Sequence, residues 1–526
     1  MQQSEITTIG DVIRFQARER GDAIAFTFEG DEMTYGHLHL RSNQAANGLI
    51  SLGVKPGDRV AYMGKNSHIY FEILAAVAKV GAVMTPINWR LAPPEVSYIV
   101  NDCQARVLFI GPEFTDLMRQ IKPLLTHVET IFGSEGPAGE ILDYRAWRDG
   151  FDETDANIPC LAGDDAVQLY TSGTTGHPKG AIMTHGSILT KRTPEEEAAM
   201  EDWQRSEPGE TSLLAMPCFH VSGTGYGISI LHGGTHAVVV REYDPSMALD
   251  FLVQYGISKI FMVPAAIQIM LNHPRVNEID FSRLKYIMYG ASPIPLDLMK
   301  RSIEVFGCGF IQMYGMTETS GTIVALNPED HDPNGNERMR SVGKPLSGVE
   351  VKIVDETGQI VPTRQVGEIA TRSRKNMKGY WNMPEATAAT IDKDGWLRTG
   401  DAGYFDEDGY LYIHDRVKDM IISGGENVYP AEVENAVYSH PLVADVAVIG
   451  VPDEKWGEAV KACVVLKAGA EVSEADIIAH ARQNIAGYKC PKSVDFISAL
   501  PRNPSGKILR RELRAPYWAG KDRAVN

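Results

Sequence analysis

The sequence predicts an α/β protein with a large N-terminal domain of α/β layers, an appended small antiparallel β unit and a smaller α+β C-terminal domain. Short buried strands alternate with helices over most of the chain, which is typical of a mainly parallel sheet. From about Gly348 the pattern changes to short β runs with turns, and at Lys418 it changes again. A chain of 526 residues also exceeds what one core usually supports, so at least two domains are expected.

The N-terminal elements follow from the hydrophobic periodicity and from helix-capping residues. Residues 6–56 predict a helix, a hairpin and a second helix that is capped by Thr34. An amphipathic helix is expected from Ile69 to Val80, and Gly81 ends it. Buried strands are expected at Asp58–Met63, Val83–Ile87, Val107–Ile110, Ala166–Tyr170, Ala237–Val240, Ile260–Val263 and Tyr286–Tyr289.

The later elements are shorter and more often separated by turns. Residues 133–163 are rich in Gly, Asp and Pro, which predicts a surface connection. The antiparallel unit is expected to contain the strands Val349–Val354, Gly367–Thr371 and Gly409–Ile413. Helices Glu432–Ser439 and Glu474–Ile485 and strands Ala444–Gly450 and Ala462–Leu466 are expected beyond Lys418. The predicted domains are residues 1–415 and 416–526.

The composition excludes several classes of function. With 51 Lys and Arg against 68 Asp and Glu, the net charge of −17 argues against nucleic acid as a partner. No apolar run approaches the roughly 18 to 20 residues of a transmembrane segment, and no secretory leader is visible, so a cytoplasmic location is expected. The six cysteines form no Cys-x-x-Cys pair, which argues against a zinc site or a disulfide framework. A homodimer is compatible with the sequence.

The loop from Tyr170 to Gly180, Tyr-Thr-Ser-Gly-Thr-Thr-Gly-His-Pro-Lys-Gly, carries the strongest functional pattern. Its glycines let backbone N–H groups turn inward, its hydroxyls add donors and its lysine adds a point charge, which together suit a polyphosphate. It is not a Walker loop, because Gly-Lys-[Ser/Thr] is absent. The alternative is a flexible surface loop. We interpret it as a triphosphate clamp that comprises Thr171, Ser172, Gly173, Thr174, Thr175, Gly176 and Lys179.

Four further stretches are more polar or richer in glycine than their neighbours. In Tyr314-Gly-Met-Thr-Glu318, the tyrosine offers an aromatic face to a base, and the last two residues suit phosphate and Mg²⁺; the alternative is a simple turn. Asp401 either accepts hydrogen bonds from ribose hydroxyls or caps a turn. The stretch Arg416–Pro430 joins charges to a tight glycine turn. Lys507 is either an amine presented at a loop tip or a solvated lysine of the tail.

These five stretches, in this order and spacing, resemble the acyl-adenylate-forming superfamily of acyl-CoA synthetases, luciferases and peptide-synthetase adenylation domains. The resemblance covers nearly the whole chain and is strongest to bacterial fatty-acyl-CoA synthetases. It implies ATP, Mg²⁺ and coenzyme A as cofactors and a small carboxylic acid as substrate. The acid would attack the α-phosphorus of Mg·ATP to give acyl-AMP and pyrophosphate, and the CoA thiol would then take the acyl group and release AMP.

The resemblance also implies a role for each matching residue. The clamp loop would hold the β- and γ-phosphates, Thr317 would contact the α-phosphate, and Glu318 would bind Mg²⁺. The adenine would be bordered by Gly290, Ala291, Ser292 and Tyr314, and the ribose would be bound by Asp401 and Arg416. Lys507 would bridge the carboxylate and the α-phosphate during adenylation. A rotation about the hinge residue Lys418 would then remove Lys507 from the site and bring in Gly424 and Gly425, which would line the pantetheine channel.

The stretch from Pro217 to Ile230 is expected to form one wall of the acyl pocket, with His220 at its mouth near the reacting carboxylate. It contains three glycines at alternate positions, and each costs a helix about 1 kcal/mol against alanine. Either the helix packs closely against its neighbours, or the missing side chains leave a channel; the glycines are Gly223, Gly225 and Gly227.

The facing segments, residues 262–264 and 289–291, carry no cation for a second carboxylate. A medium- to long-chain fatty acid is therefore the expected substrate, with an aryl or other carboxylic acid as the alternative. An amino-acid adenylation enzyme is disfavoured, because such relatives usually have Asp where His220 stands. A degenerate ATP-binding sensor would be expected to lack Lys507 or Glu318, and both are present.

Overall fold

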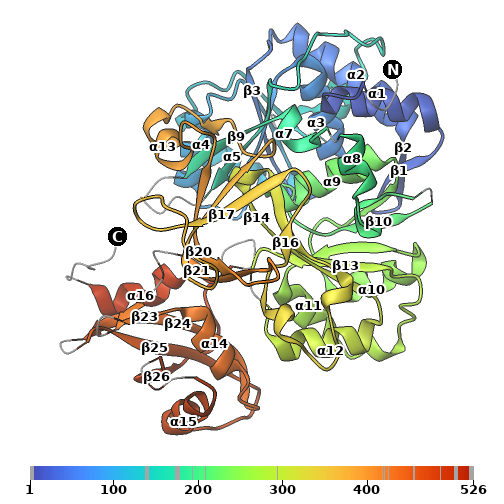
Figure 1. The fold of residues 1–526 in the computed structure, drawn as a ribbon. Coiled ribbons are helices and arrows are strands. Elements are labelled where there is room, and N and C mark those ends of the chain that lie inside the picture. Colours follow the sequence, from blue (N-terminus) through green and yellow to red (C-terminus); the bar gives the residue numbers. More distant parts are fainter. Residues whose placement is uncertain are drawn as a thin grey trace.

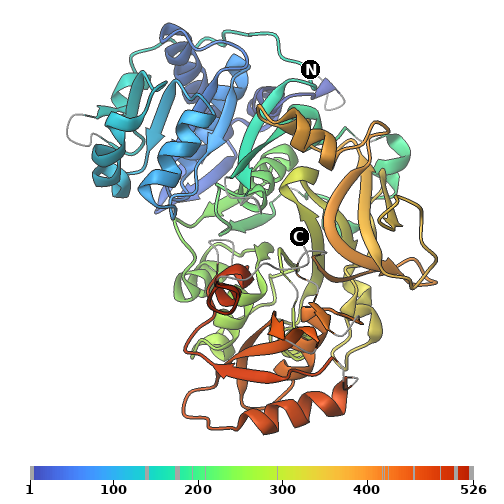
Figure 2. The same ribbon diagram turned by 90° about the vertical axis from the view of Figure 1, so that its left-hand side faces the viewer.

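The computed structural model contains four β-sheets with helices between and around them (Figures 1 and 2). It confirms the predicted α/β class, with a large N-terminal part and a smaller C-terminal part. The structure describes residues 5–136, 141–171, 178–191, 193–207, 209–292, 294–416, 419, 421–423, 426–453, 456–485, 487, 489–502 and 507–519, and of residues 414–416, 422, 426, 427 and 457 it describes only the backbone. Among these residues no helix has the length and apolar character needed to cross a membrane.

The first large sheet has eight strands in the order β19-β9-β8-β4-β3-β5-β6-β7. Its strands from β3 to β8 pair in parallel, and β9 joins them antiparallel to β8. The strands are β3 (Arg59–Met63), β4 (Val83–Pro86), β5 (Val107–Ile110), β6 (Thr130–Gly133), β7 (Leu142–Asp143), β8 (Asp165–Thr171), β9 (Lys179–Thr184) and β19 (Gly379–Tyr380).

The second large sheet has nine strands in the order β16-β15-β14-β13-β12-β10-β11-β1-β2. Its central strands, from β1 through β11, β10, β12 and β13 to β14, pair in parallel. The strands are β1 (Ile24–Phe28), β2 (Asp31–Thr34), β10 (Thr211–Leu214), β11 (His236–Val239), β12 (Lys259–Met262), β13 (Tyr286–Gly290), β14 (Gly309–Met316), β15 (Gly321–Leu326) and β16 (Lys344–Pro345).

Helix α3 (His68–Val80) lies in the main core, which takes residues from both large sheets, and every residue of the helix is buried. Ser67 caps its start and Gly81, at φ 75°, ends it as predicted. Thr34 likewise caps the second helix. The other helices of this part are α1 (Ile9–Arg20), α2 (Tyr35–Ser51), α4 (Pro93–Asp102), α5 (Thr115–Ile121), α6 (Tyr144–Arg148), α7 (His185–Leu189), α8 (Pro194–Ala198), α9 (Val221–Gly233), α10 (Pro245–Gln254), α11 (Pro264–Leu271), α12 (Leu296–Phe306) and α13 (Pro384–Thr390).

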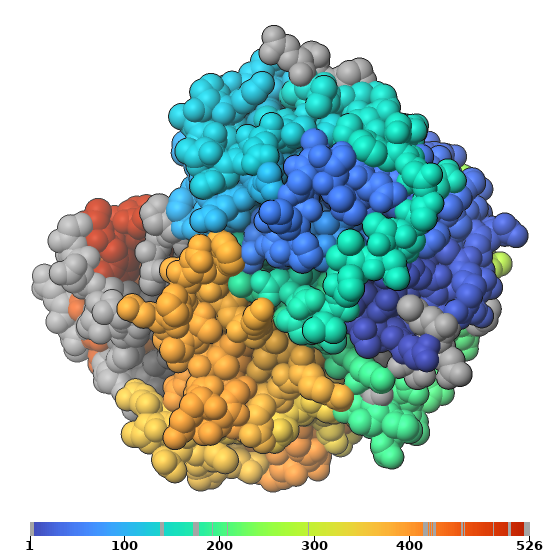
Figure 3. Space-filling view, turned by 90° about the horizontal axis from the view of Figure 1, so that it is seen from above, coloured from blue at the N-terminus to red at the C-terminus, as the bar shows by residue number. Residues whose placement is uncertain are grey.

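The predicted antiparallel unit is the third sheet, of order β17-β18-β20-β21. Its strands are β17 (Val349–Val354), β18 (Gly367–Ser373), β20 (Leu397–Phe405) and β21 (Leu411–Arg416). Seen from above, its orange residues share a face with the blue N-terminal residues (Figure 3).

The fourth sheet follows β21 and has its own core. We propose the domain boundary at this point, between residues 415 and 416. The C-terminal elements are β22 (Ile421–Ser423), β23 (Glu426–Val428), β24 (Val443–Asp453), β25 (Gly457–Leu466), β26 (Ser493–Phe496), α14 (Pro430–Tyr438), α15 (Glu474–Asn484) and α16 (Arg510–Trp518).

The stretch 133–163 is more than the surface connection that its composition predicts. It contains β7 and α6, and α6 places two side chains in the protein interior. The hydroxyl of Tyr144 donates to Oε1 of Glu72 at 2.6 Å, and Nη1 of Arg148 donates to the same oxygen at 2.7 Å. The buried carboxylate on α3 thus fixes the connection, and the Gly, Asp and Pro content of the sequence concealed this contact.

Candidate active site

One cavity of about 2020 Å³ is bordered by both large sheets, the antiparallel unit and the C-terminal elements. It collects ten of the predicted site residues from distant parts of the chain. They are Thr171, Lys179, His220, Ala291, Ser292, Tyr314, Thr317, Glu318, Asp401 and Lys507. The joint presence of these side chains makes the cavity the candidate active site.

The clamp loop connects two antiparallel strands, β8 and β9. Thr171 at the end of β8 pairs with Lys179 at the start of β9, so the ends of the loop lie side by side at the cavity wall. The predicted clamp residues Ser172, Gly173, Thr174, Thr175 and Gly176 lie outside the described residues. The strand pair therefore positions the loop, and the phosphate contacts predicted for its interior stay predictions.

Glu318 is a buried carboxylate at the cavity wall, with 6% of its surface exposed. Its Oε1 accepts a hydrogen bond from the hydroxyl of Tyr380 at 2.8 Å, and its backbone oxygen accepts one from the N–H of Met377 at 2.8 Å. Nζ of Lys179 lies 5.1 Å from the centroid of the Tyr380 ring. Tyr380 thus connects the predicted metal ligand to the predicted phosphate cation.

Tyr380 has no counterpart among the residues that the sequence pattern singles out. Its position comes from the pairing of β19 with β9, in which Tyr380 lies opposite Ala181. That pairing joins residues about 200 positions apart, and no local pattern in Gly379-Tyr380-Trp381 predicts the pairing. A tyrosine can in general pack its ring and donate a hydrogen bond from its hydroxyl. Which tyrosine does so at this site can be known only from the strand pairing.

The predicted nucleoside residues lie at the end of β13, near the end of β14 and in the middle of β20. The hydroxyl of Tyr314 donates to Oδ2 of Asp401 at 2.8 Å, so the two predictions converge on one contact. A Cβ on Gly290 would lie 2.2 Å from the backbone oxygen of Met313, so only glycine fits there. Ala291 follows with φ 67°, a left-handed conformation that strains a non-glycine residue.

For several predicted site residues the structure describes only the backbone or does not describe the residue. Asp401 on β20 pairs with Arg416 on β21, which places the two predicted ribose residues opposite each other, although the Arg416 side chain is not described. The predicted hinge and pantetheine residues, Lys418, Gly424 and Gly425, lie outside the described residues.

His220 precedes α9 and faces the cavity. Burial, with a smaller contribution from the positive charges of Lys507 and Arg90, lowers the pKa of His220 to about 3, so the imidazole is neutral near pH 7. Its buried Nε2 has no hydrogen-bond partner among the described residues. Lys507 on the C-terminal side of the cavity is therefore close enough to influence the imidazole, as expected if both serve one site.

The three glycines of α9 have different structural roles. A Cβ on Gly223 would lie 2.2 Å from the backbone oxygen of Pro217, and one on Gly227 would lie 2.2 Å from Cζ of Phe71. A Cβ on Gly225 would meet only Cγ2 of Val221 at 3.8 Å, and Gly225 borders the cavity. Close packing accounts for the outer two glycines, and the channel explanation fits the middle one alone.

The cavity also has a cation near the predicted acyl wall. The segments named in the sequence analysis have none, but Lys259, at the start of β12, borders the cavity. Its Nζ lies 2.9 Å from Oε2 of Glu210, and both side chains are buried. The positive charge is therefore balanced locally, so the cavity has no unpaired cation at this point for a second carboxylate.

Family models match most of the chain. The model described as AMP-binding enzyme matches residues 13–381, and the model described as AMP-binding enzyme C-terminal domain matches residues 432–507. The latter match ends at Lys507, the lysine that borders the cavity.

Several characterised proteins are similar over their whole length. A fatty acid–[acyl-carrier-protein] ligase, ScoC, from Streptomyces coeruleorubidus is 40% identical over 99% of both chains. A feruloyl-CoA synthase from an Amycolatopsis species is 39% identical over 95% of this chain and 97% of its own. The long-chain-fatty-acid–CoA ligase FadD13 from Mycobacterium tuberculosis is 36% identical over 93% of each chain.

Solved structures of one protein from Rhodopseudomonas palustris, MatB, show the same fold in two states. ATP-bound MatB is 29% identical, covers 97% of this chain and 99% of its own, and gives a TM-score of 0.87. Apo MatB, at the same identity and coverage, gives 0.78. The arrangement of this chain is therefore more similar to the ATP-bound state.

The cavity residues fit the cofactors of this family. The buried carboxylate of Glu318 suits a hard cation, and Mg²⁺ commonly takes only one or two carboxylates because phosphates and water complete its shell. In the described part of the chain, no cluster of three or more His, Cys, Asp and Glu side chains forms a metal site. The close approach at Gly290 and the Tyr314–Asp401 pair suit a nucleoside. The chain belongs to the AMP-binding enzyme family and is an ATP-dependent, AMP-forming acyl-CoA ligase that uses Mg²⁺ and coenzyme A.

Proposed function

We propose that this ligase activates an uncharged, elongated carboxylic acid, with medium- to long-chain fatty acids preferred over acetate and benzoate. The observation that carries the proposal is the lining of the cavity, in which α9 residues between Val221 and His232, Gly225 included, and Phe261 border the same space as His220 and Lys507. An acid held at His220 and Lys507 would extend its tail into this space. Each buried methylene contributes up to about 0.8 kcal/mol, so specificity should rise with chain length until the channel is filled.

In the proposed adenylation step, Lys507 lies beside both the acid and the α-phosphate. Two anionic groups must approach each other, and a positive charge between them offsets their repulsion. His220 is neutral, so it contributes no charge of its own and can accept or donate a hydrogen bond at its buried Nε2. Together these two residues would orient the carboxylate at the start of the channel.

The phosphates of ATP would lie between Lys179 and Thr317, and Glu318 would hold Mg²⁺, which neutralises charge on the transferring phosphates. The hydrogen bond from Tyr380 fixes the Glu318 carboxylate in position. Tyr314 would border the adenine and orient Asp401 toward the ribose. These groups bind and orient the nucleotide, and Lys507 completes the site from the C-terminal side.

We infer that the described arrangement is the one that carries out adenylation. Lys507 borders the cavity together with Glu318 and His220. The higher TM-score with ATP-bound than with apo MatB supports the same interpretation. We propose that thioester formation requires the C-terminal domain to rotate about Lys418, so that Lys507 leaves and the turn at Gly424 and Gly425 enters.

An aryl acid is the second candidate, because aromatic side chains gather along the same channel. Trp203, Phe261 and Tyr226 all border the cavity, and the rings of the last two lie 6.3 Å apart. Flat rings pack well against such side chains. The feruloyl-CoA synthase relative, at 39% identity, agrees with this alternative.

The test is acid-dependent ATP–pyrophosphate exchange followed by thioester formation with coenzyme A. The panel comprises acetic, hexanoic, octanoic, dodecanoic, benzoic and cinnamic acids. A kcat/KM that rises with chain length supports the fatty acid proposal, and a maximum at cinnamic acid supports the aryl alternative. A maximum at acetic acid would contradict both. Exchange with no acid of the panel would contradict the proposed substrate range as a whole.

A further inference from the structure

The floor of the acyl channel is built from successive rows of side chains across the nine-stranded sheet. In one row, Phe261 on β12 pairs with Met288 on β13, which pairs with Ile311 on β14. In the next row on the same face, Lys259 lies two residues earlier in β12 and pairs with Ser212 on β10. Adjacent rows on one face lie about 6.6 Å apart, at about 3.3 Å per residue of parallel strand.

The order of the rows relative to the reacting groups follows from strand direction. Ala291 and Tyr314, which border the nucleotide side of the cavity, lie at or beyond the carboxyl-terminal part of their strands. An acyl chain that begins there meets the apolar row of Phe261 and Met288 first. The polar row of Ser212 and Lys259 comes after it, farther from the chemistry. The channel thus changes from apolar to polar with depth.

Helix α9 adds a second polar group at the same depth. Tyr226 lies six residues after His220, which corresponds to about 9 Å along a helix axis at about 1.5 Å per residue. The Tyr226 hydroxyl is buried and has no hydrogen-bond partner among the described residues. Burial raises the pKa of Tyr226, and the nearby Ser212 hydroxyl opposes this rise as a hydrogen-bonding neighbour, so the phenol stays protonated and can donate to a ligand.

Lys259 supplies a further donor beside Tyr226. Within the described residues, its Nζ contacts the backbone oxygen of Arg205 at 2.5 Å and Oε2 of Glu210 at 2.9 Å. The ring of Tyr286 also lies beside this Nζ, with its centroid 5.9 Å away. An ammonium group has three N–H donors, so beyond the two oxygens one N–H can still meet another oxygen acceptor. Glu210 balances the charge, and its carboxylate would repel a second carboxylate brought to this end. The deep end of the channel therefore suits a neutral group that accepts hydrogen bonds.

We propose that the acid selected by this ligase carries a neutral oxygen group, a hydroxyl or a ketone, at the end remote from its carboxylate. That oxygen would accept hydrogen bonds from the Tyr226 hydroxyl and from Nζ of Lys259. The inference rests on the proposed function, because it requires the acid to lie along α9. An unsubstituted chain of the same length would leave the Tyr226 hydroxyl and the remaining N–H of Lys259 without an acceptor, which disfavours its binding.

The experiment compares pairs of acids that differ only at the far end. Octanoic and decanoic acids are measured against their ω-hydroxy, (ω−1)-keto and ω-carboxy counterparts, by kcat/KM in pyrophosphate exchange. We expect the wild-type enzyme to prefer the ω-hydroxy or (ω−1)-keto acid by about tenfold at the matching length, the scale of one buried hydrogen bond. In the Tyr226→Phe variant the preference should fall to within about twofold.

The Tyr243→Phe variant is the matched control. It also removes a phenolic hydroxyl, which donates to the backbone oxygen of Ala266 at 3.0 Å, and it should keep the wild-type preference. Equal use of plain and ω-hydroxy acids by the wild-type enzyme would overturn the inference, as would a preference for ω-carboxy acids or one that survives in Tyr226→Phe. If plain acids support exchange without any preference, only this inference fails. If none of the acids supports exchange, the proposed function fails with it.

Discussion

Two buried lysines show how differently one residue type is used in this molecule. Lys79 on α3 has 2% of its surface exposed, and its Nζ donates to the oxygen of His39, to Oγ of Ser42 and to Oδ1 of Asn43 at 2.6 to 3.0 Å. Lys259 has 7% exposed and borders the cavity, and two partners for its Nζ are found among the described residues. All donors of the first lysine are used within the scaffold, whereas the second has one left for a ligand.

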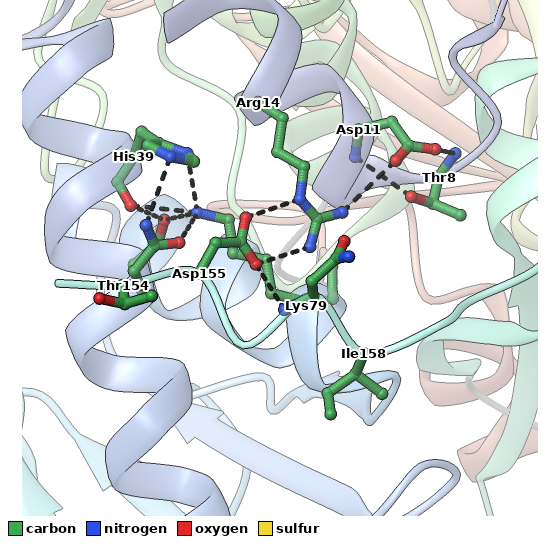
Figure 4. A network of polar contacts seen from close by, with 12 residues as sticks. Thr8, Asp11, Arg14, His39, Lys79, Thr154, Asp155 and Ile158 are labelled. Carbon is green, nitrogen blue, oxygen red and sulfur yellow. Dashed lines mark hydrogen bonds and ion pairs between the residues drawn. The ribbon is translucent and has the colours of Figure 1, made fainter. Parts of the chain in front are cut away.

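The surroundings of Lys79 extend this contrast. Figure 4 shows Arg14 between Asp11 and Asp155, next to the Lys79 cluster. Nε of Arg14 donates to Oδ2 of Asp155 at 2.7 Å, which holds the segment after α6 against α1. In the acyl channel, by contrast, the Tyr226 hydroxyl has no partner among the described residues. A saturated buried network indicates architecture, and buried donors that face a cavity indicate a binding site.

The largest effect is expected for Lys507, and it tests whether this lysine acts in the adenylation step alone. Lys507→Ala should lower the rate of adenylation by about 10² or more, the scale of one preorganised charge-stabilising donor. Thioester formation from supplied acyl-AMP should be largely retained. The control is Lys467→Ala, which removes an exposed lysine of the same domain whose Nζ donates to the oxygen of Pro441. Equal loss in both half-reactions would show that Lys507 does not act in adenylation.

Lys79, in contrast, should make the free energy of unfolding depend on pH. Burial lowers the pKa of Lys79 to about 7 from its ordinary 10.5, so between these values the unfolded chain binds more protons than the native protein. Stability contributed by this group therefore rises with pH in that window, by about 2 kcal/mol between pH 7 and pH 9. Urea denaturation at both pH values should show this rise in wild type and a smaller rise in Lys79→Met. An unchanged pH dependence would mean that Lys79 remains charged when buried.

The glycines of α9 allow the contrast to be tested within one helix. Gly227→Val should destabilise the protein by about 1 to 3 kcal/mol, because the new side chain meets the Phe71 ring. Gly225→Val should leave the melting temperature nearly unchanged but shift the preferred acid toward shorter chains, since its side chain enters the cavity. Thermal denaturation and a chain-length series measure the two effects. A destabilised Gly225→Val enzyme with wild-type chain-length preference would argue against the channel.

The smallest effect concerns the residue that sequence reasoning missed. Tyr380→Phe should raise the KM for Mg·ATP by about five- to tenfold, because Glu318 loses a hydrogen bond that fixes its carboxylate. Tyr410→Phe removes an equivalent bond, from a phenol to Oδ1 of Asp330 at 2.8 Å, outside the cavity, and should leave this KM unchanged. If both variants behave alike, the Tyr380 hydroxyl has no specific role at the nucleotide.

Local sequence patterns predicted the helices and strands whose formation and ends depend on neighbouring residues in the chain. The strand Val107–Ile110 and the helix that ends at Gly81 agree with the structure closely, because periodicity and capping are local properties. Tyr380 and the Lys259 row could not be predicted, since their positions depend on which strands pair and in what register. The buried contacts of α6 were missed for the same reason, because Glu72 lies on a distant helix.

The shared wall of the cavity has a thermodynamic consequence. Because Lys507 of the C-terminal part and Glu318 of the N-terminal part border the same cavity, a ligand that contacts both must bind more tightly when the two parts are docked. By linkage, such a ligand strengthens docking by the same free energy that docking adds to its binding. A non-hydrolysable acyl-adenylate would therefore stabilise the docked arrangement of the two parts. Residues 1–415 expressed alone should bind this ligand less tightly than the full chain does.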